Sequence, residues 1–159
     1  MTMGAAFFLD SNVIVKYYIS EPHSAWVRAL IASPDHSFII SELSIAEVAA
    51  ALSQLRRDKK ISRKAMEQLY ERFLFDIKPG LFFPRPIDFE TVARAAEIAL
   101  THAIKGADAI QVASAALSED AIAVELTFVS NDRQALRVAQ LEALEVDNPS
   151  DHPETTEIR

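Results

Sequence analysis

The chain has 159 residues, half of them apolar and a quarter charged, which predicts one folded domain with a sizeable core and excludes wholesale disorder. The formal net charge of −7 argues against broad, charge-driven binding to nucleic acid, and the lack of cysteine excludes disulfides, thiolate metal sites and a cysteine nucleophile. The opening MTMGAAFFLD lacks the basic region and apolar length of a signal peptide, and no stretch is long enough to span a membrane. We therefore expect a soluble, cytoplasmic protein with no membrane partner.

The first half of the chain alternates short apolar runs with longer amphipathic stretches, which is the pattern of strands followed by helices. Small polar residues stand where helices are expected to start, and they are suitable N-caps because their side chains accept hydrogen bonds from free backbone N–H groups. In chain order, the predicted elements are a strand at Ala5–Leu9, a helix at Val13–Ile19, a helix opened by Pro22, a strand at Phe38–Ile40, a helix that follows Ser41–Ser44 and ends near Asp58, and a helix from Ile61 to about Asp76.

The second half continues the same alternation. Pro84 and Pro86 are expected to end the strand before them, because proline lacks the N–H that a sheet ladder requires. We expect one domain over residues 1–148 and a polar, proline-broken, loose tail over residues 149–159. In chain order, the predicted elements are a strand at Leu81–Phe83, a helix capped by Asp88 that carries Val92 to Leu100, an alanine-rich helix at Lys105–Leu117, a strand at Thr127–Val129, a helix at Asp132–Leu141 and an edge strand at Leu144–Val146.

This order of elements predicts an α/β fold, a three-layer α/β/α sandwich with a short, mainly parallel sheet. Ligands of such sheets collect outside the carboxyl ends of the strands. Asp10 directly follows the first strand, Glu47 lies in the first turn of the helix after the second strand, and Asp132 follows the fourth strand. These three carboxylates are therefore expected at the same edge of the sheet.

Each of the three carboxylates also has a simpler explanation as part of a helix cap. Asp10 and Asp132 are typical N-caps, and Ser44-Ile45-Ala46-Glu47 matches a capping box, in which the glutamate bonds back to the start of its own helix. Asp108 is harder to explain in this way, because its helix, KGADAIQVASAA, is nearly apolar all round. The alternative for Asp108 is an ion pair with Lys105, three residues earlier.

A site that contained all four carboxylates would require a cation. Two carboxylates about 4 Å apart repel each other by roughly 4 kcal/mol at an effective dielectric constant near 20. A cluster of four would destabilise the fold or take up protons unless a cation neutralised it. Oxygen ligands favour Mg²⁺ or Mn²⁺ over zinc, and the four histidines are scattered without the spacing of metal ligands.

The four acidic stretches, in this order and spacing, resemble the PIN-domain nucleases, and most closely the VapC-type ribonuclease toxins of bacterial toxin–antitoxin pairs. The matching stretches are FFLDSNVIVKYY, ISELSIAEVAAAL, HAIKGADAIQVASAAL and FVSNDRQAL, and the resemblance extends from about Phe7 to Val146. It implies a PIN-like fold whose catalytic and metal-binding residues are Asp10, Glu47, Asp108 and Asp132, with Ser11 and Ser130 at the small hydroxyl positions beside them.

The resemblance also implies what each residue does. Asp10 and Asp108 are expected to be the principal ligands of Mg²⁺ or Mn²⁺, while Glu47 and Asp132 position water or a second ion. The hydroxyl groups of Ser11 and Ser130 would orient these carboxylates or a substrate phosphate. The candidates for contact with the substrate are the basic residues Lys16, Lys105 and Arg133.

The implied function is that of a Mg²⁺-dependent endoribonuclease, the toxin of a toxin–antitoxin pair. Its expected partners are the RNA substrate, a cognate antitoxin and a second copy of the chain in a homodimer. One alternative is a catalytically inactive PIN-like scaffold that binds RNA or protein. Another is a metal-dependent phosphatase or phosphoacceptor domain with Asp10 as the nucleophile, although a phosphatase is expected to have a second aspartate at position 12, where this chain has Asn12.

Overall fold

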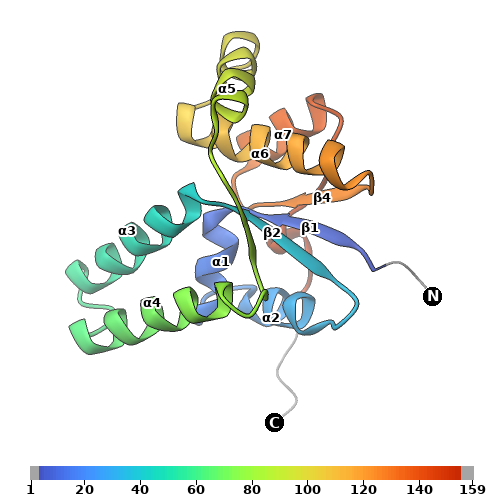
Figure 1. Cartoon of the computed structure of the whole chain (residues 1–159). Helices are drawn as coiled ribbons and strands as arrows, with labels where there is room; N and C mark the ends of the chain where they lie inside the picture. The colour runs from blue at the N-terminus through green and yellow to red at the C-terminus, as the bar shows by residue number, and fades with distance from the viewer. Residues whose placement is uncertain (1–3, 155–159) are drawn as a thin grey trace.

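The sheet at the centre of the molecule has five strands, and every neighbouring pair is parallel (Figure 1). The computed structural model describes residues 4–154. The strand order β3-β2-β1-β4-β5 places β1 in the middle, so the chain winds outward from β1 first in one direction and then in the other. The strands are β1 (Ala6–Leu9), β2 (Ser37–Ser41), β3 (Phe83–Arg85), β4 (Leu126–Val129) and β5 (Glu145–Asp147).

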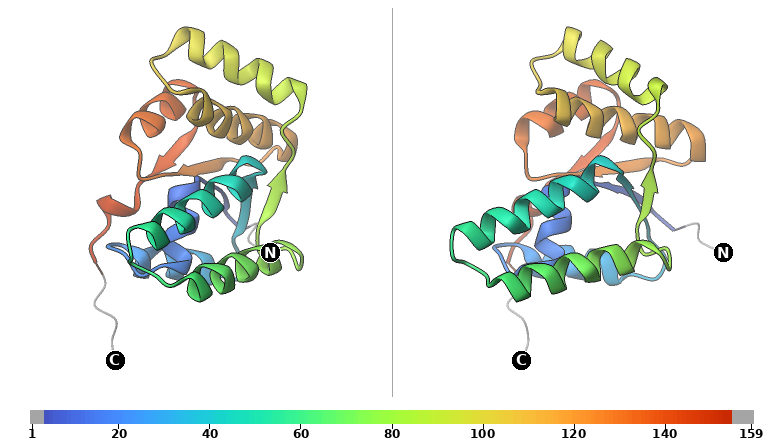
Figure 2. Two further views of the ribbon diagram at one scale, coloured as in Figure 1. Left: turned by 90° about the vertical axis from the view of Figure 1, so that its left-hand side faces the viewer. Right: turned by 60° about the vertical axis from the view of Figure 1, so that its left-hand side comes forward.

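Helices cover both faces of the sheet, which confirms the predicted α/β/α sandwich (Figure 2). One layer consists of α1 (Ser11–Tyr18), α2 (Ser24–Ala32), α3 (Leu43–Arg57) and α4 (Arg63–Ile77), and the other consists of α5 (Phe89–Thr101), α6 (Gly106–Ile122) and α7 (Arg133–Leu141). None of the helices within residues 4–154 combines the length and the apolar character needed to cross a lipid bilayer.

Alternation along the central strand divides the core into two parts. In β1, Phe8 packs with residues of α5, α6 and α7, whereas the next residue, Leu9, packs with residues of α1 to α4. Both side chains are fully buried, and burial of each stabilises the fold by about 1.5–3 kcal/mol. A central strand that is apolar on both faces is thus buried between two helical layers.

The third strand does not lie where the sequence predicted it. Prolines were expected to end a strand at Leu81–Phe83, but β3 spans Phe83–Arg85 and contains Pro84, which pairs with Ile40 of β2. β3 is an edge strand, so Pro84 needs no N–H on its free side.

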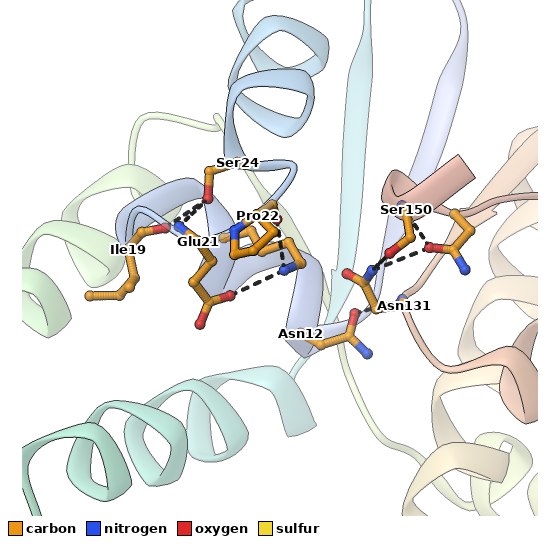
Figure 3. Close-up of polar contacts among 9 residues, drawn as sticks. Asn12, Ile19, Glu21, Pro22, Ser24, Asn131 and Ser150 are labelled. Atoms are coloured by element: carbon orange, nitrogen blue, oxygen red, sulfur yellow. Dashed lines mark hydrogen bonds and ion pairs between the residues drawn. The ribbon is translucent and has the colours of Figure 1, made fainter. Parts of the chain in front are cut away.

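The start of α2 also differs from the prediction. Pro22 was expected in the first turn, but the helix begins at Ser24 after His23, whose φ of 68° is left-handed. The Ser24 hydroxyl closes the turn: it accepts a bond from the Glu21 N–H and donates one to Ile19 O, both at 2.9 Å (Figure 3).

Residues 149–152 are packed rather than loose, contrary to the expectation for this part of the tail. Pro149 is buried in a short 3₁₀ turn, η1 (Pro149–Asp151). After it, the His152 imidazole stacks on the Trp26 indole, with ring centroids 4.2 Å apart and planes inclined by 11°. The predicted loose tail also includes residues 155–159, which lie outside the described residues.

Candidate active site

The carboxyl ends of β1 and β4 lie side by side at the point where the strand order reverses. β1 and β4 pair along their whole lengths, and the chain leaves them toward opposite layers of helices. Such a reversal leaves a crevice at the strand ends, where α/β proteins commonly bind ligands. Asp10 follows β1 and Asp132 caps α7 after β4, so both residues lie at this edge of the sheet.

Asp10 is buried and held by two short hydrogen bonds. The Ser11 N–H donates to Oδ1 at 2.7 Å, and the Ser130 hydroxyl donates to Oδ2 at 2.8 Å. Burial raises the pKa of Asp10 to about 6; the bonds from Ser130 and Ser11 lower it in part, and the charges of Glu47 and Asp108 raise it further. The carboxylate is therefore fixed in place, but its negative charge is poorly compensated.

Glu47 is oriented by residues far away in the sequence and does not form the capping box that was considered for it. Helix α3 begins at Leu43, and the Glu47 Oε1 atom accepts bonds from Ser11 Oγ at 2.8 Å and from Gln111 Nε2 at 2.7 Å. The hydroxyl of Ser44, the proposed cap, instead contacts Ser11 Oγ and Gln111 Nε2. The capping explanation for Glu47 is therefore wrong.

Asp108 lies in the first turn of α6 and interacts with the three other acids. Partial burial raises its pKa, as do the charges of Asp132 and Glu47, while Lys105 lowers it by a smaller amount. Within residues 4–154, Lys105 and Asp108 form no ion pair at or below 4 Å. Asp108 also raises the pKa of Asp10, so the charges of the four predicted carboxylates influence one another.

Asp132 is an N-cap, as the sequence predicted, and it also faces the cluster. Its Oδ1 atom accepts bonds from the N–H groups of Gln134 at 2.9 Å and Ala135 at 3.1 Å. Its own N–H donates to Ser130 Oγ at 3.0 Å, the same hydroxyl that bonds to Asp10. Capping occupies one oxygen of the carboxylate, so it does not exclude a role for the other.

Gln111 is a site residue that the sequence reasoning missed. Its Nε2 atom lies 2.7 Å from Glu47 Oε1 and 3.1 Å from both Ser11 Oγ and Ser44 Oγ, and the side chain is only 1% exposed. A glutamine among small and apolar residues, one helical turn after Asp108, was the available signal.

Asn12 is a second site residue missing from the predicted set. Its Oδ1 atom accepts the Asn131 N–H at 3.0 Å, which ties the start of α1 to the loop after β4 (Figure 3). Its amide lies 3.3 Å from Ser130 Oγ. The sequence reasoning treated position 12 only as the place where a phosphatase would have a second aspartate.

The donor set fits a hard divalent cation, although the side chains do not form a ready-made cage. Among the described residues 4–154, no three His, Cys, Asp or Glu side chains are close enough together to hold a metal ion. Mutual repulsion keeps such carboxylates apart unless a cation neutralises them. The donors are carboxylate oxygens supported by hydroxyl groups, which suit Mg²⁺ or Mn²⁺, and the pKa of Asp10 is raised chiefly by burial and further by the charges of Glu47 and Asp108.

The basic candidates for substrate contact differ in their exposure and in whether their side chains are already paired within the protein. The Lys16 ammonium lies 3.2 Å from Glu21 Oε2 and 3.1 Å from Pro22 O, so it is already engaged within the protein. Arg133 lies largely exposed, 3.3 Å from Asp151. Lys105 is exposed immediately before α6.

Comparison with known proteins gives one family and several similar structures. The PIN domain family model matches residues 7–141. FitAcB from Neisseria gonorrhoeae has a TM-score of 0.65 and 24% sequence identity, over 92% of this chain and 99% of that chain. FitAB bound to an IR36 DNA fragment has a TM-score of 0.65 and 26% identity, over 95% and 99%. A toxin–antitoxin complex from Klebsiella pneumoniae has a TM-score of 0.58 and 18% identity, over 84% and 90%. The curated protein sequences gave no match.

Proposed function

The chain belongs to the PIN domain family, and from that premise we propose that it is a metal-dependent endoribonuclease, the toxin of a toxin–antitoxin pair. The observation that carries the proposal is the buried Asp10, bonded to Ser130 and Ser11 at the carboxyl ends of β1 and β4, whose pKa is raised further by the charges of Glu47 and Asp108. A phosphodiester is itself anionic, so carboxylates alone would repel it. The cluster therefore makes chemical sense as the holder of a cation that attracts the substrate.

In this proposal Asp10 and Asp108 hold Mg²⁺, or Mn²⁺ in its place. When bound, the cation neutralises phosphate charge and lowers the pKa of water. The Ser130 hydroxyl and the Ser11 N–H keep the Asp10 carboxylate in one orientation. A carboxylate fixed in this way needs little reorganisation when the cation and the phosphate arrive.

Glu47 and Asp132 are the two remaining carboxylates of the proposed site. Glu47 is oriented by Ser11 Oγ and Gln111 Nε2, both bonded to its Oε1 atom, and serves to position water for attack on phosphorus. Asp132 keeps one oxygen on the helix cap and supports the cation or a second ion with the other.

The proposed partners are RNA, a cognate antitoxin and a second copy of the chain. The antitoxin is inferred from the resemblance in sequence and from the likeness to the toxin–antitoxin complex of Klebsiella pneumoniae. We place the homodimer contact on the outward face of α5, where Phe89, Val92 and Leu100 are exposed. We propose that the protein acts in the cytoplasm, together with its proposed RNA substrate.

Substitution of the two proposed principal ligands tests the nuclease assignment. Asp10→Asn and Asp108→Asn should each lower RNA cleavage in Mg²⁺ by at least a hundredfold, because a neutral amide is a poor partner for the cation. The measurement is cleavage of RNA by purified protein, with and without a chelator. Asp120→Asn changes an exposed aspartate on the same helix as Asp108 and should retain full activity. Undiminished cleavage by both site variants would refute the proposal.

The same assay separates the alternatives. A scaffold would bind Mn²⁺ or RNA without single-turnover cleavage. A phosphatase would hydrolyse a small phosphomonoester and leave RNA intact. Asn12 accepts a hydrogen bond from the Asn131 N–H, so its side chain has a structural role. An asparagine at this position supplies no acid for a phosphatase mechanism.

A further inference from the structure

The loop after β4 is held by the segment that follows β5. This loop, Ser130–Asp132, contains two of the proposed site residues. The Ser130 N–H donates to Asp147 O at 3.1 Å. The Asn131 amide donates to Asn148 Oδ1 at 3.2 Å and to Ser150 Oγ at 2.8 Å (Figure 3). The Asn131 side chain thus points away from the carboxylates and toward residues 147–152, which we call the His152 clamp.

On its other side, the same loop is bonded to the carboxylate site. The Asn131 N–H donates to Asn12 Oδ1, and the neighbouring Ser130 hydroxyl donates to Asp10 Oδ2 at 2.8 Å. The Asp132 N–H donates to that same Ser130 hydroxyl. Asn131 therefore joins two sets of bonds: its backbone belongs to the site and its side chain belongs to the clamp.

The clamp is itself well anchored. Asn148 is 3% exposed, and its Oδ1 atom also accepts the Ser150 N–H at 2.9 Å. His152 Nε2 lies 2.7 Å from Asp147 Oδ1 while its ring stacks on Trp26, so the clamp is fixed to both β5 and α2. An anchored partner can hold the loop in one position.

The stability of the fold alone does not account for Asn131. Its Oδ1 atom is buried and has no hydrogen-bond partner within the described residues. A buried polar atom without a partner destabilises a protein. The same amide group links the clamp to the site through its Nδ2 atom.

We propose that Asn131 is a positioning residue of the nuclease site, through which the His152 clamp sets the positions of Asp132 and Ser130, and through Ser130 that of Asp10. The inference rests on the proposed function, because it assigns the clamp a part in holding the carboxylates for a divalent cation. Residues that orient ligands from behind commonly alter metal affinity or activity by ten- to a hundredfold when they are replaced.

Two substitutions, one at each end of the hydrogen bond between Asn131 and Ser150, test the proposal. Asn131→Ala removes the amide, and Ser150→Ala removes one of its acceptors on an exposed residue whose loss should not affect folding. We expect Mn²⁺ affinity without RNA, measured by calorimetry, to fall about tenfold in Asn131→Ala and by a smaller factor in Ser150→Ala. At saturating Mn²⁺ and RNA, kcat should fall while KM stays within about twofold.

Two variants serve as controls, and a third tests the anchoring of the clamp. Ser150→Thr keeps the hydroxyl and should restore wild-type affinity. Asp120→Asn changes an exposed aspartate in the last turn of α6, outside the clamp, and it should change nothing. His152→Ala removes the stack on Trp26, the one tryptophan in the sequence, so a change in tryptophan fluorescence reports the loss of the stack. Because the stack anchors the clamp to α2, this variant should lower Mn²⁺ affinity.

The outcomes distinguish this inference from the proposed function. If Asn131→Ala lowers only the melting temperature, with Mn²⁺ affinity and kcat within about twofold of wild type, the positioning role is wrong. If Asp10→Asn loses Mn²⁺ affinity and RNA cleavage in the same experiment, the nuclease assignment still stands. If Asp10→Asn keeps Mn²⁺ affinity and RNA cleavage, the proposed function fails, and the positioning role fails with it.

Discussion

The raised pKa of Asp10 makes the stability of the protein depend on pH. Its pKa is raised from 3.8 to about 6, chiefly by burial. The folded state therefore holds a proton more tightly than the unfolded chain does, and the stability this contributes is complete below pH 3.8 and lost as the pH rises through 6. The loss amounts to about 3 kcal/mol at pH 7.5, from 1.36 kcal/mol per pKa unit.

Asp10→Asn should therefore stabilise the metal-free protein at pH 7.5, because it removes a buried charge that lacks compensation. The gain should vanish near pH 4, where Asp10 is protonated in the folded wild type. Denaturation by urea in the presence of a chelator measures the free energy of unfolding at pH 7.5 and at pH 4, with Asp120→Asn as the control. An Asp10→Asn variant less stable than wild type at pH 7.5 would show that the hydrogen bonds of the carboxylate outweigh its burial.

Gln111 offers a second test at the scale of one residue. Gln111→Met keeps the volume but removes the donor shared by Ser11, Ser44 and Glu47, so Glu47 loses one of its two bonds. We expect RNA cleavage to fall about tenfold or more with little change in metal-free stability, because the Gln111 Oε1 atom is already unpaired within the described residues. Ser114→Ala on the same helix should leave cleavage unchanged, and equal losses in the two variants would point to a packing effect.

Individual site residues could be predicted where their surroundings were informative. Asp108 was recognisable because a carboxylate stood among small and apolar residues. Glu47 was ambiguous, since a capping box is a local pattern, while the partners that orient Glu47 are Ser11 and Gln111. Local sequence does not reveal tertiary hydrogen bonds, which is also why Gln111 and Asn131 were missed.

At the scale of elements, helix α5 stands out because its outer face has no cover within the described residues. Figure 1 shows α5 as the outermost helix, beyond α6. Phe89 and Leu100 are 86% and 89% exposed, and Val92 lies between them on the same helix. The inner residues Ala95 and Ile98 are buried, so α5 is apolar on two sides.

Leu100→Glu should convert the proposed homodimer into a monomer without unfolding it, because the side chain contributes little to the core. Light scattering coupled to gel filtration measures the mass. Phe75→Glu is the matched control, since Phe75 is 67% exposed on α4 in the opposite layer, and it should leave the dimer intact. A Leu100→Glu variant that stays dimeric would move the contact away from α5.

Elements were predictable wherever local signals agreed. Ser62 and Asp88 cap α4 and α5 as expected, because each side chain accepts the bond that a cap requires. The error at β3 arose because the effect of a proline depends on whether its strand lies at an edge. The order of strands in the sheet, which decides this, is not a local property.

At the scale of the whole molecule, the family match confirms the predicted resemblance to PIN domains, and the parallel sheet confirms the predicted fold. The placement of Asp10 and Asp132 followed from one general rule about parallel sheets. The His152 clamp did not follow from any such rule. Its proline-broken composition suggested a loose segment, whereas its packing depends on tertiary contacts, among them the stack against Trp26 in α2.

The position of the His152 clamp late in the sequence means that a partly synthesised chain lacks it. Ribosomes release a chain from its first residue onward, so Asp10, Glu47 and Asp108 emerge well before Ser150. If the clamp holds the loop after β4 in position, a nascent chain that has not passed residue 152 carries all four carboxylates but lacks the bonds that align them. By the proposal above, such a partial chain would bind a divalent cation more weakly than the folded protein does, even though every proposed ligand is already present.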